Sequence, residues 1–219
     1  MTTDAMNRGN AHHWLATAYH EAGHAVMVLQ LGRTLLWVEL EAAVSGVTWS
    51  KGLFDRLDRL IEQAGRTGRV PAELLRLWRE EFWISDAGMV AEAEFNLVPT
   101  EQLARGGLGD AFKKLALRPD SERYPLVRDY FHRHLGRHAD ALTEDCRQFF
   151  RLPRIAAMTR TLAEALLRSR RLEGDEVIDV LLANRAHATG QCDLFWQPQG
   201  DEPTVRRKLP PLPRQLHML

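Results

Sequence analysis

The run His20-Glu21-Ala22-Gly23-His24 constrains this chain more than any other feature of its sequence. On a helix, residues four apart lie one turn above each other on the same face, so two imidazoles at this spacing can bind one metal ion. Glu21 then lies beside the metal, where a carboxylate can take a proton from a zinc-bound water whose pKa the metal has lowered. The competing interpretation is a helix with two surface histidines, but the small residues Ala22 and Gly23 favour close packing. The run therefore predicts a His-Glu-x-x-His zinc-hydrolase motif on a helix.

Composition predicts a soluble globular protein. The chain has 219 residues with 45% apolar side chains, enough for one domain with an ordinary core. Its 29 basic and 29 acidic residues balance, which gives no general attraction for nucleic acid. No apolar run is long enough for a membrane span, and the N-terminus lacks a signal-peptide core, so we expect a cytoplasmic protein. Cys146 and Cys192 form no disulfide framework and lack the spacing of thiolate zinc ligands.

The pattern along the chain predicts a mainly α (α+β) fold. A zincin-like helical domain would carry the motif on one helix, with a small β-hairpin beside it. We expect a flexible segment at 1–11, a peptidase-like domain at 12–196 and a Pro-rich extended or disordered tail at 197–219. Helices are predicted at 14–31, 53–63, 71–82, 84–95, 111–117, 124–135, 139–170 with a break near Pro153, and 174–188, and strands at 35–40 and 46–49.

The predicted hairpin has two interpretations. Beside the motif helix, the segment Gly46-Val47-Thr48 can act as an edge strand on which an extended peptide pairs through main-chain hydrogen bonds. The same hairpin can instead simply cover the core. The residues alone favour neither interpretation.

A catalytic zinc usually takes three protein ligands, so the motif needs a third. Asp110 follows a glycine-rich loop at the start of a predicted helix, a placement that also suits an N-cap without metal. A second group consists of His132, His134 and His138, but neighbouring arginines would repel a cation. His12 and His13 are nearer in sequence, although adjacent helical residues point apart. The residues alone leave the third ligand open.

Several segments, in this order, resemble the peptidase domain of the FtsH-type ATP-dependent zinc proteases. They are Tyr19-His20-Glu21-Ala22-Gly23-His24-Ala25-Val26, Ser45-Gly46-Val47-Thr48, Ala87-Gly88-Met89-Val90-Ala91-Glu92, Gly106-Gly107-Leu108-Gly109-Asp110 and Arg171-Leu172-Glu173-Gly174-Asp175-Glu176-Val177. The resemblance covers most of residues 12–185. Its first motif is specific, and the others are short.

The resemblance implies a ligand set and a general base. In that family two motif histidines and a downstream Asp hold the zinc, which implies His20, His24 and Asp110 here, with Glu21 as the base. Glu92 matches a family Glu, which implies a carboxylate that orients a ligand histidine. The family's Arg and second Glu in this helix are not matched. We expect a stand-alone domain that lacks the ATPase module and membrane anchor of that family.

These observations predict a zinc metalloendopeptidase, a hydrolase that cleaves peptide bonds in unfolded segments or peptides. The alternative is a non-catalytic, zinc-stapled module that binds a partner protein. Both functions are compatible with a separate ATPase or adaptor as partner and with a homo-oligomer. Retention of Glu21 favours catalysis, because a purely structural metal site needs no general base.

Overall fold

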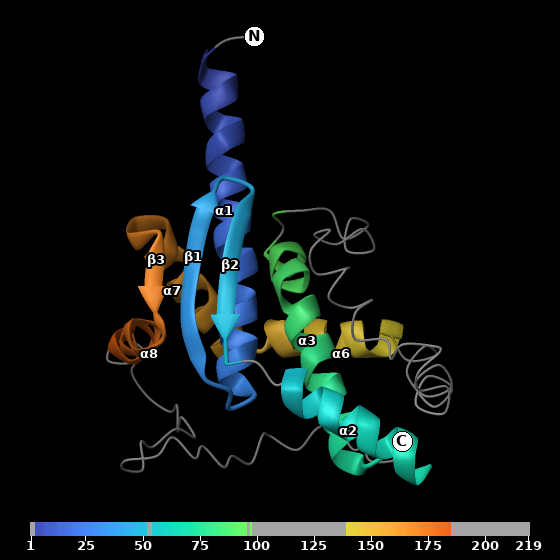
Figure 1. The fold of residues 1–219 in the computed structure, drawn as a ribbon. Helices are drawn as coiled ribbons and strands as arrows, with labels where there is room; N and C mark the ends of the chain where they lie inside the picture. The colour runs from blue at the N-terminus through green and yellow to red at the C-terminus, as the bar shows by residue number, and fades with distance from the viewer. Residues whose placement is uncertain (1–2, 52–53, 96, 98–138, 185–219) are drawn as a thin grey trace.

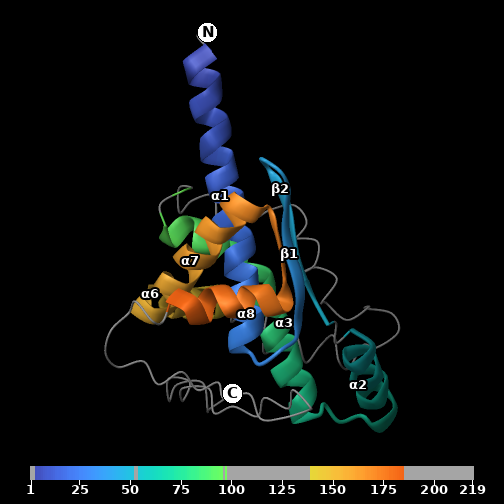
Figure 2. The same ribbon diagram turned by 90° about the vertical axis from the view of Figure 1, so that its left-hand side faces the viewer.

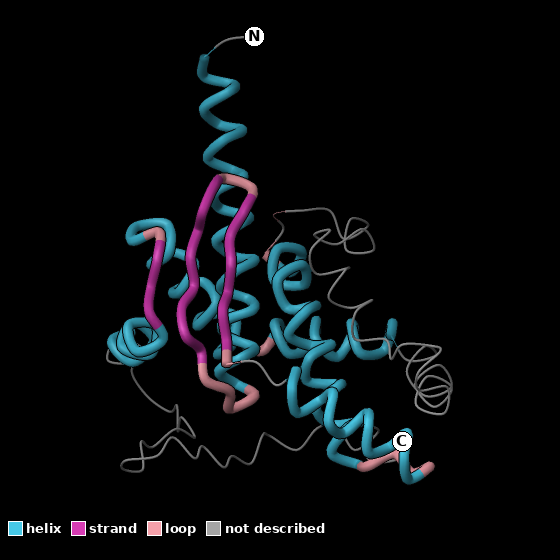
Figure 3. The backbone as a smooth tube through the Cα atoms, viewed as in Figure 1, coloured by secondary structure: helices cyan, strands magenta, loops and turns pink. Residues whose placement is uncertain are grey.

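The computed structural model describes residues 3–51, 54–95, 97 and 139–184. Within these ranges the chain forms mostly helices with one small antiparallel sheet, as the sequence predicted. The helices are α1 (Thr3–Gln30), α2 (Phe54–Thr67), α3 (Ala72–Glu94), α6 (Ala139–Arg151), α7 (Pro153–Ser169) and α8 (Gly174–Ala183). The strands are β1 (Leu35–Ala42), β2 (Ser45–Ser50) and β3 (Arg171–Glu173). Figure 3 shows these elements along the backbone.

Helix α1 is the central element of the fold. Every residue from 18 to 28 is buried except His20, which is partly exposed. A helix buried on all sides must be surrounded by other elements, and α1 packs against α3, α7 and the hairpin. Its start at Thr3 lies well before the predicted start at residue 14. Its end is as predicted, because Gly32 adopts a positive φ of 70° just after the last turn.

The sheet lies along one side of α1, as Figures 1 and 2 show. Its strand order is β2-β1-β3, and both pairs are antiparallel. Val38 in the middle strand pairs with Thr48 on one side and with Leu172 on the other, and its side chain is fully buried. The hairpin was predicted from the sequence, whereas the three-residue strand β3 was not. Strand β2 therefore forms one edge of the sheet that the described residues make.

Helix α3 corrects one sequence prediction. We expected two helices, at 71–82 and 84–95, but Ala72–Glu94 is continuous. No Gly or Pro interrupts it before Gly88, so the backbone has no reason to break near Trp83. Helix α3 packs against α1, α2 and α6, so more than one of its faces is covered and its apolar residues do not follow a single stripe.

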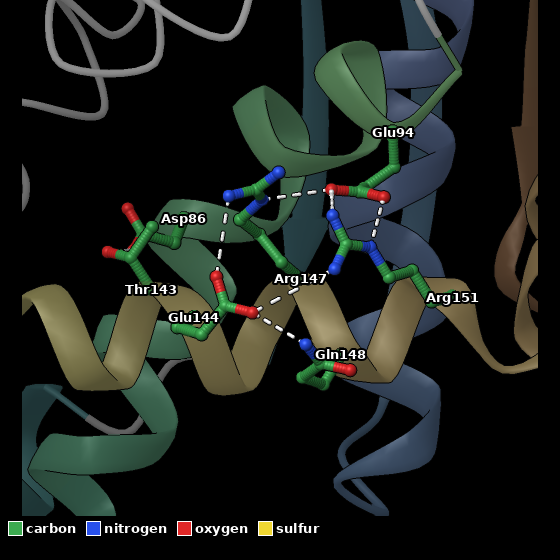
Figure 4. Close-up of polar contacts among 7 residues, drawn as sticks. All are labelled: Asp86, Glu94, Thr143, Glu144, Arg147, Gln148 and Arg151. Atoms are coloured by element: carbon green, nitrogen blue, oxygen red, sulfur yellow. Dashed lines mark hydrogen bonds and ion pairs between the residues drawn. The ribbon is translucent and has the colours of Figure 1, made fainter.

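An ion-pair cluster joins the C-terminal end of α3 to α6 (Figure 4). Glu94 of α3 accepts hydrogen bonds from Arg147 Nε at 2.9 Å and from Arg151 Nε at 2.7 Å. Nearby, the hydroxyl of Thr143 donates to the fully buried carboxylate of Asp86 at 2.6 Å. These contacts fix the half of α3 that faces the motif histidines.

A single residue anchors the chain between α1 and β1 to the N-terminal half of α3. Arg33 Nη2 contacts Glu80 Oε2 at 2.9 Å, and Arg33 Nη1 pairs with Glu81. All three side chains are largely buried.

Across the described residues, none of the helices is both long enough and apolar enough to cross a bilayer.

Candidate metal centre

The two motif histidines converge as a metal site requires. His20 and His24 lie one turn apart on α1, and their Nε2 atoms are 3.0 Å from each other. The ring centroids are 4.6 Å apart, with the planes tilted by 76°. The Nε2 lone pairs of neutral imidazoles repel at this distance unless a proton or a cation lies between them.

The opposite ring nitrogens have partners that favour the tautomer a metal needs. His24 Nδ1 lies 2.6 Å from the carbonyl oxygen of Ile84 on α3. A carbonyl oxygen only accepts, so Nδ1 carries a hydrogen, which in the neutral tautomer leaves the lone pair on Nε2. His20 Nδ1 contacts the carboxylate of Glu92, one of the predicted site residues, also on α3. Such a partner fixes the orientation and tautomer of a ligand imidazole.

Gly88 of α3 provides the space in front of the two histidines. A Cβ added at Gly88 would lie 2.5 Å from the Nε2 atom of His20 and 2.5 Å from that of His24. The missing side chain therefore leaves the space in front of both nitrogens clear, and we call this space the Gly88 cradle. Zinc–imidazole bonds are about 2.0–2.1 Å long, so a zinc ion bound to both nitrogens needs this space free of side-chain atoms.

Gly23, between the two histidines, brings the helices together. A Cβ there would lie 2.6 Å from the carbonyl oxygen of Ala87 and 2.7 Å from Cβ of Ala91. Helices α1 and α3 thus cross at a point where only glycine fits on α1. This close approach allows residues of α3 to reach both imidazoles.

Glu21 lies between α1 and the hairpin and is only 4% exposed. The hydroxyl of Thr48 on β2 donates to Glu21 Oε2 at 2.7 Å, and it also lies 3.1 Å from the carbonyl oxygen of Glu21. Gly46 of β2 packs on the same side chain, because a Cβ there would lie 2.6 Å from Glu21 Cγ. Of the predicted substrate-binding residues, Gly46 and Thr48 therefore contact the proposed base, and Val47 lies between them on β2.

The third ligand is not defined by the described residues. Asp110 and the alternatives His132, His134 and His138 lie outside the described ranges. His12 is two turns before His20, and its Nε2 is 3.0 Å from the carbonyl oxygen of Leu97. Within the ranges that the structure describes, no three His, Cys, Asp or Glu side chains gather as a metal-binding group. The described part thus brings together His20 and His24, two of the three predicted ligands.

The electrostatics at the end of α3 depend on the ion-pair cluster. Burial raises the pKa of the Glu94 carboxyl, but the hydrogen bonds and charges of Arg151 and Arg147 outweigh burial, so its pKa lies below the ordinary value. Glu94 is two residues beyond Glu92 and points to α6, whereas Glu92 contacts His20. The two carboxylates of this turn therefore have separate partners.

Sequence reasoning missed three contributors to this centre, which are the Gly88 cradle, the Ile84 carbonyl and the Thr48 hydroxyl. Only Gly88 left a local signal, since it is the single glycine inside a 23-residue helix. A glycine in a helix interior is unfavourable and often has a packing or functional reason. The other two contacts depend on how distant segments pack.

Comparison with known proteins agrees with a peptidase-type site. A family model described as Peptidase M50B-like matches residues 8–70, which include the motif, the hairpin and α2. This family is distinct from the FtsH-type proteases that the short segments resemble. No curated protein matches the chain. The matched segment, which carries both histidines and Glu21, is similar to a metallopeptidase family and supports a metallopeptidase-type function.

Proposed function

We propose that this protein is a zinc metalloendopeptidase that hydrolyses peptide bonds in unfolded segments or peptides. The observation that carries the proposal is the convergence of the His20 and His24 Nε2 atoms on the cradle at Gly88. His20, His24 and Asp110 would hold the metal, and Glu92 would orient His20. Zinc, when bound, polarises the scissile carbonyl and lowers the pKa of a coordinated water.

Glu21 acts as the general base. Its carboxylate takes a proton from the attacking water as the new C–O bond forms. It then passes this proton to the leaving amine as the C–N bond breaks. Burial of Glu21 beneath β2 supports this role, because a carboxylate shielded from bulk water has fewer competing partners.

Strand β2 would hold the substrate. It is an edge of the described sheet, with β1 on one side only. Main-chain pairing of an extended peptide along Gly46, Val47 and Thr48 would bring its scissile bond beside Glu21, which contacts two of these residues. Such pairing tolerates many sequences, which suits unfolded substrates.

The finer proposal is an FtsH-type peptidase domain that acts in the cytoplasm. It is supported by the order of the short motifs and by the placement of Glu92 against His20. A separate ATPase or adaptor would deliver folded substrates, and the domain could assemble as a homo-oligomer. The Peptidase M50B-like match supports the metallopeptidase function but not the FtsH-type assignment.

The test is hydrolysis of a reduced and alkylated protein by zinc-loaded wild type, beside Glu21→Gln purified identically. Glu21→Gln keeps the histidines and the side-chain size but removes the base. Cleavage by wild type alone, abolished by a chelator, is the expected result. If neither protein cleaves while both hold one zinc, the alternative of a zinc-stapled binding module replaces the peptidase.

A further inference from the structure

The carboxylate of Glu21 is held by strand β2 rather than by its own helix. Thr48 Oγ1 donates to Oε2 at 2.7 Å, which is within the usual range for such a bond. The same hydroxyl lies 3.1 Å from the main-chain oxygen of Glu21, and its single hydrogen favours the closer, side-chain acceptor. The Thr48 hydroxyl therefore lies close to both the side chain and the main chain of Glu21.

Gly46 limits the other side of the same carboxylate. A Cβ at Gly46 would lie 2.6 Å from Glu21 Cγ and 2.9 Å from Oε1. The main chain of β2 thus packs directly on the side chain at Cγ and Oε1, while Thr48 binds Oε2. A glutamate with three rotatable bonds has many rotamers in solution, and these two contacts together select one.

We propose that Thr48 is a positioning residue that holds Glu21 in the orientation needed for proton transfer. The role rests on the proposed peptidase function, since it acts through the general base. Misplacement of a catalytic group by about 1 Å can lower a rate by roughly a hundredfold. The Thr48 hydroxyl prevents such misplacement, and the hairpin thereby couples substrate binding to the base.

The chain offers a matched control at the same junction. The hydroxyl of Thr17 on α1 donates to the carbonyl oxygen of Ala43 at 2.7 Å, so it also joins α1 to the hairpin. Thr17→Val and Thr48→Val each remove one hydroxyl without changing the size of the side chain. Only the second substitution removes a partner of Glu21.

In zinc-loaded protein, Thr48→Val should lower kcat by roughly tenfold to a hundredfold with little change in KM or zinc content. Thr48→Ser should restore most of kcat, because serine keeps the donor. Thr17→Val should retain the wild-type kcat. Wild-type kcat in Thr48→Val, or equal losses in the two Thr→Val variants, would overturn the positioning role.

A second measurement is independent of activity. A double-mutant cycle on unfolding stability, with Thr48→Val and Glu21→Ala, should show coupling, so that the double variant loses less than the sum of the singles. The cycle with Thr17→Val and Glu21→Ala should be additive. Additivity in the first cycle would refute the contact itself. An inactive wild type would instead refute the proposed peptidase function. Thr48 would then have no catalytic role, even if its contact with Glu21 were confirmed.

Discussion

The Nδ1 atom of His20 contacts the Oε1 atom of Glu92, although 72 positions separate the two residues in the chain. The contact joins the motif helix to α3 and gives the imidazole a negatively charged partner. Loss of such a partner usually costs a metal site about 10–100-fold in affinity. Both ends of this contact lie in the proposed centre.

Glu92→Ala should therefore weaken zinc binding by roughly 10–100-fold, measured by competition with a chromophoric chelator. Glu94→Gln is the control on the same helix, because Glu94 contacts Arg147 and Arg151 and not His20. The control should bind zinc as tightly as wild type while it remains folded. Equal affinities in Glu92→Ala and wild type would mean that this carboxylate does not support the ligand.

Gly88→Ala should abolish zinc binding, because its Cβ would lie 2.5 Å from both Nε2 atoms. Zinc content after dialysis, with circular dichroism to monitor folding, measures the effect. Gly68→Ala controls for lost stability alone, because its Cβ would meet nothing within 4 Å but its φ of 67° strains an alanine; this variant should keep its zinc. A folded Gly88→Ala protein that retains its zinc would show that zinc binding does not need the Gly88 cradle.

Asp110→Ala should reduce zinc content after dialysis, because the resemblance makes Asp110 the third ligand. Asp110 lies outside the described residues, so this substitution tests the sequence alone. His134→Ala and His138→Ala should leave the zinc in place. Loss of zinc in the histidine variants but not in Asp110→Ala would move the third ligand to the second histidine group.

Acid should weaken the junction of α3 and α6 through Glu94. Its pKa is lowered in the folded protein, so its contribution to stability is complete above the ordinary value of 4.5 and is lost as the pH falls through the folded value. The stability difference between wild type and Glu94→Gln, from urea unfolding, should shrink as the pH falls below 4.5. Glu73→Gln removes a more exposed ion pair and should change stability little. A pH-independent difference for Glu94→Gln would contradict the assignment.

Asp145 on α6 should show the opposite behaviour. Burial and the neighbouring Glu144 raise the pKa of its carboxyl, although Arg79 opposes them. The folded state therefore disfavours ionised Asp145, and stability falls as the pH rises past its unfolded pKa. Asp145→Asn should raise the unfolding midpoint at pH values above the raised pKa, with no gain in acid. The exposed Asp58→Asn should have little effect, and an equal gain there would point to net charge as the cause.

Local patterns in the sequence predicted the elements that depend on near neighbours. The end of α1 at Gly32, the hairpin and the break before Pro153 all follow from residues adjacent to them. Strand β3 has only three residues, and its pairing with β1 joins segments more than 130 positions apart. A strand this short carries no pattern of its own, so it was missed.

The residues of the candidate centre also differ in how well the sequence predicts them. His20, Glu21 and His24 could be predicted because a helix fixes their relative positions. The contact of Glu92 with His20 follows from a resemblance and not from spacing, and the contact of Ile84 with His24 depends on where α3 crosses α1. The partner of Glu21 on β2 required the packed hairpin.

The single glycine inside α3 is an exception to a common rule of protein engineering. Replacing an interior helical glycine by alanine typically stabilises a helix by up to about 1 kcal/mol. At residue 88 this gain is opposed, because the added Cβ would lie 2.5 Å from two imidazole nitrogens and the rings would have to move. Directed evolution for heat resistance should therefore leave residue 88 as glycine, even when no metal is required.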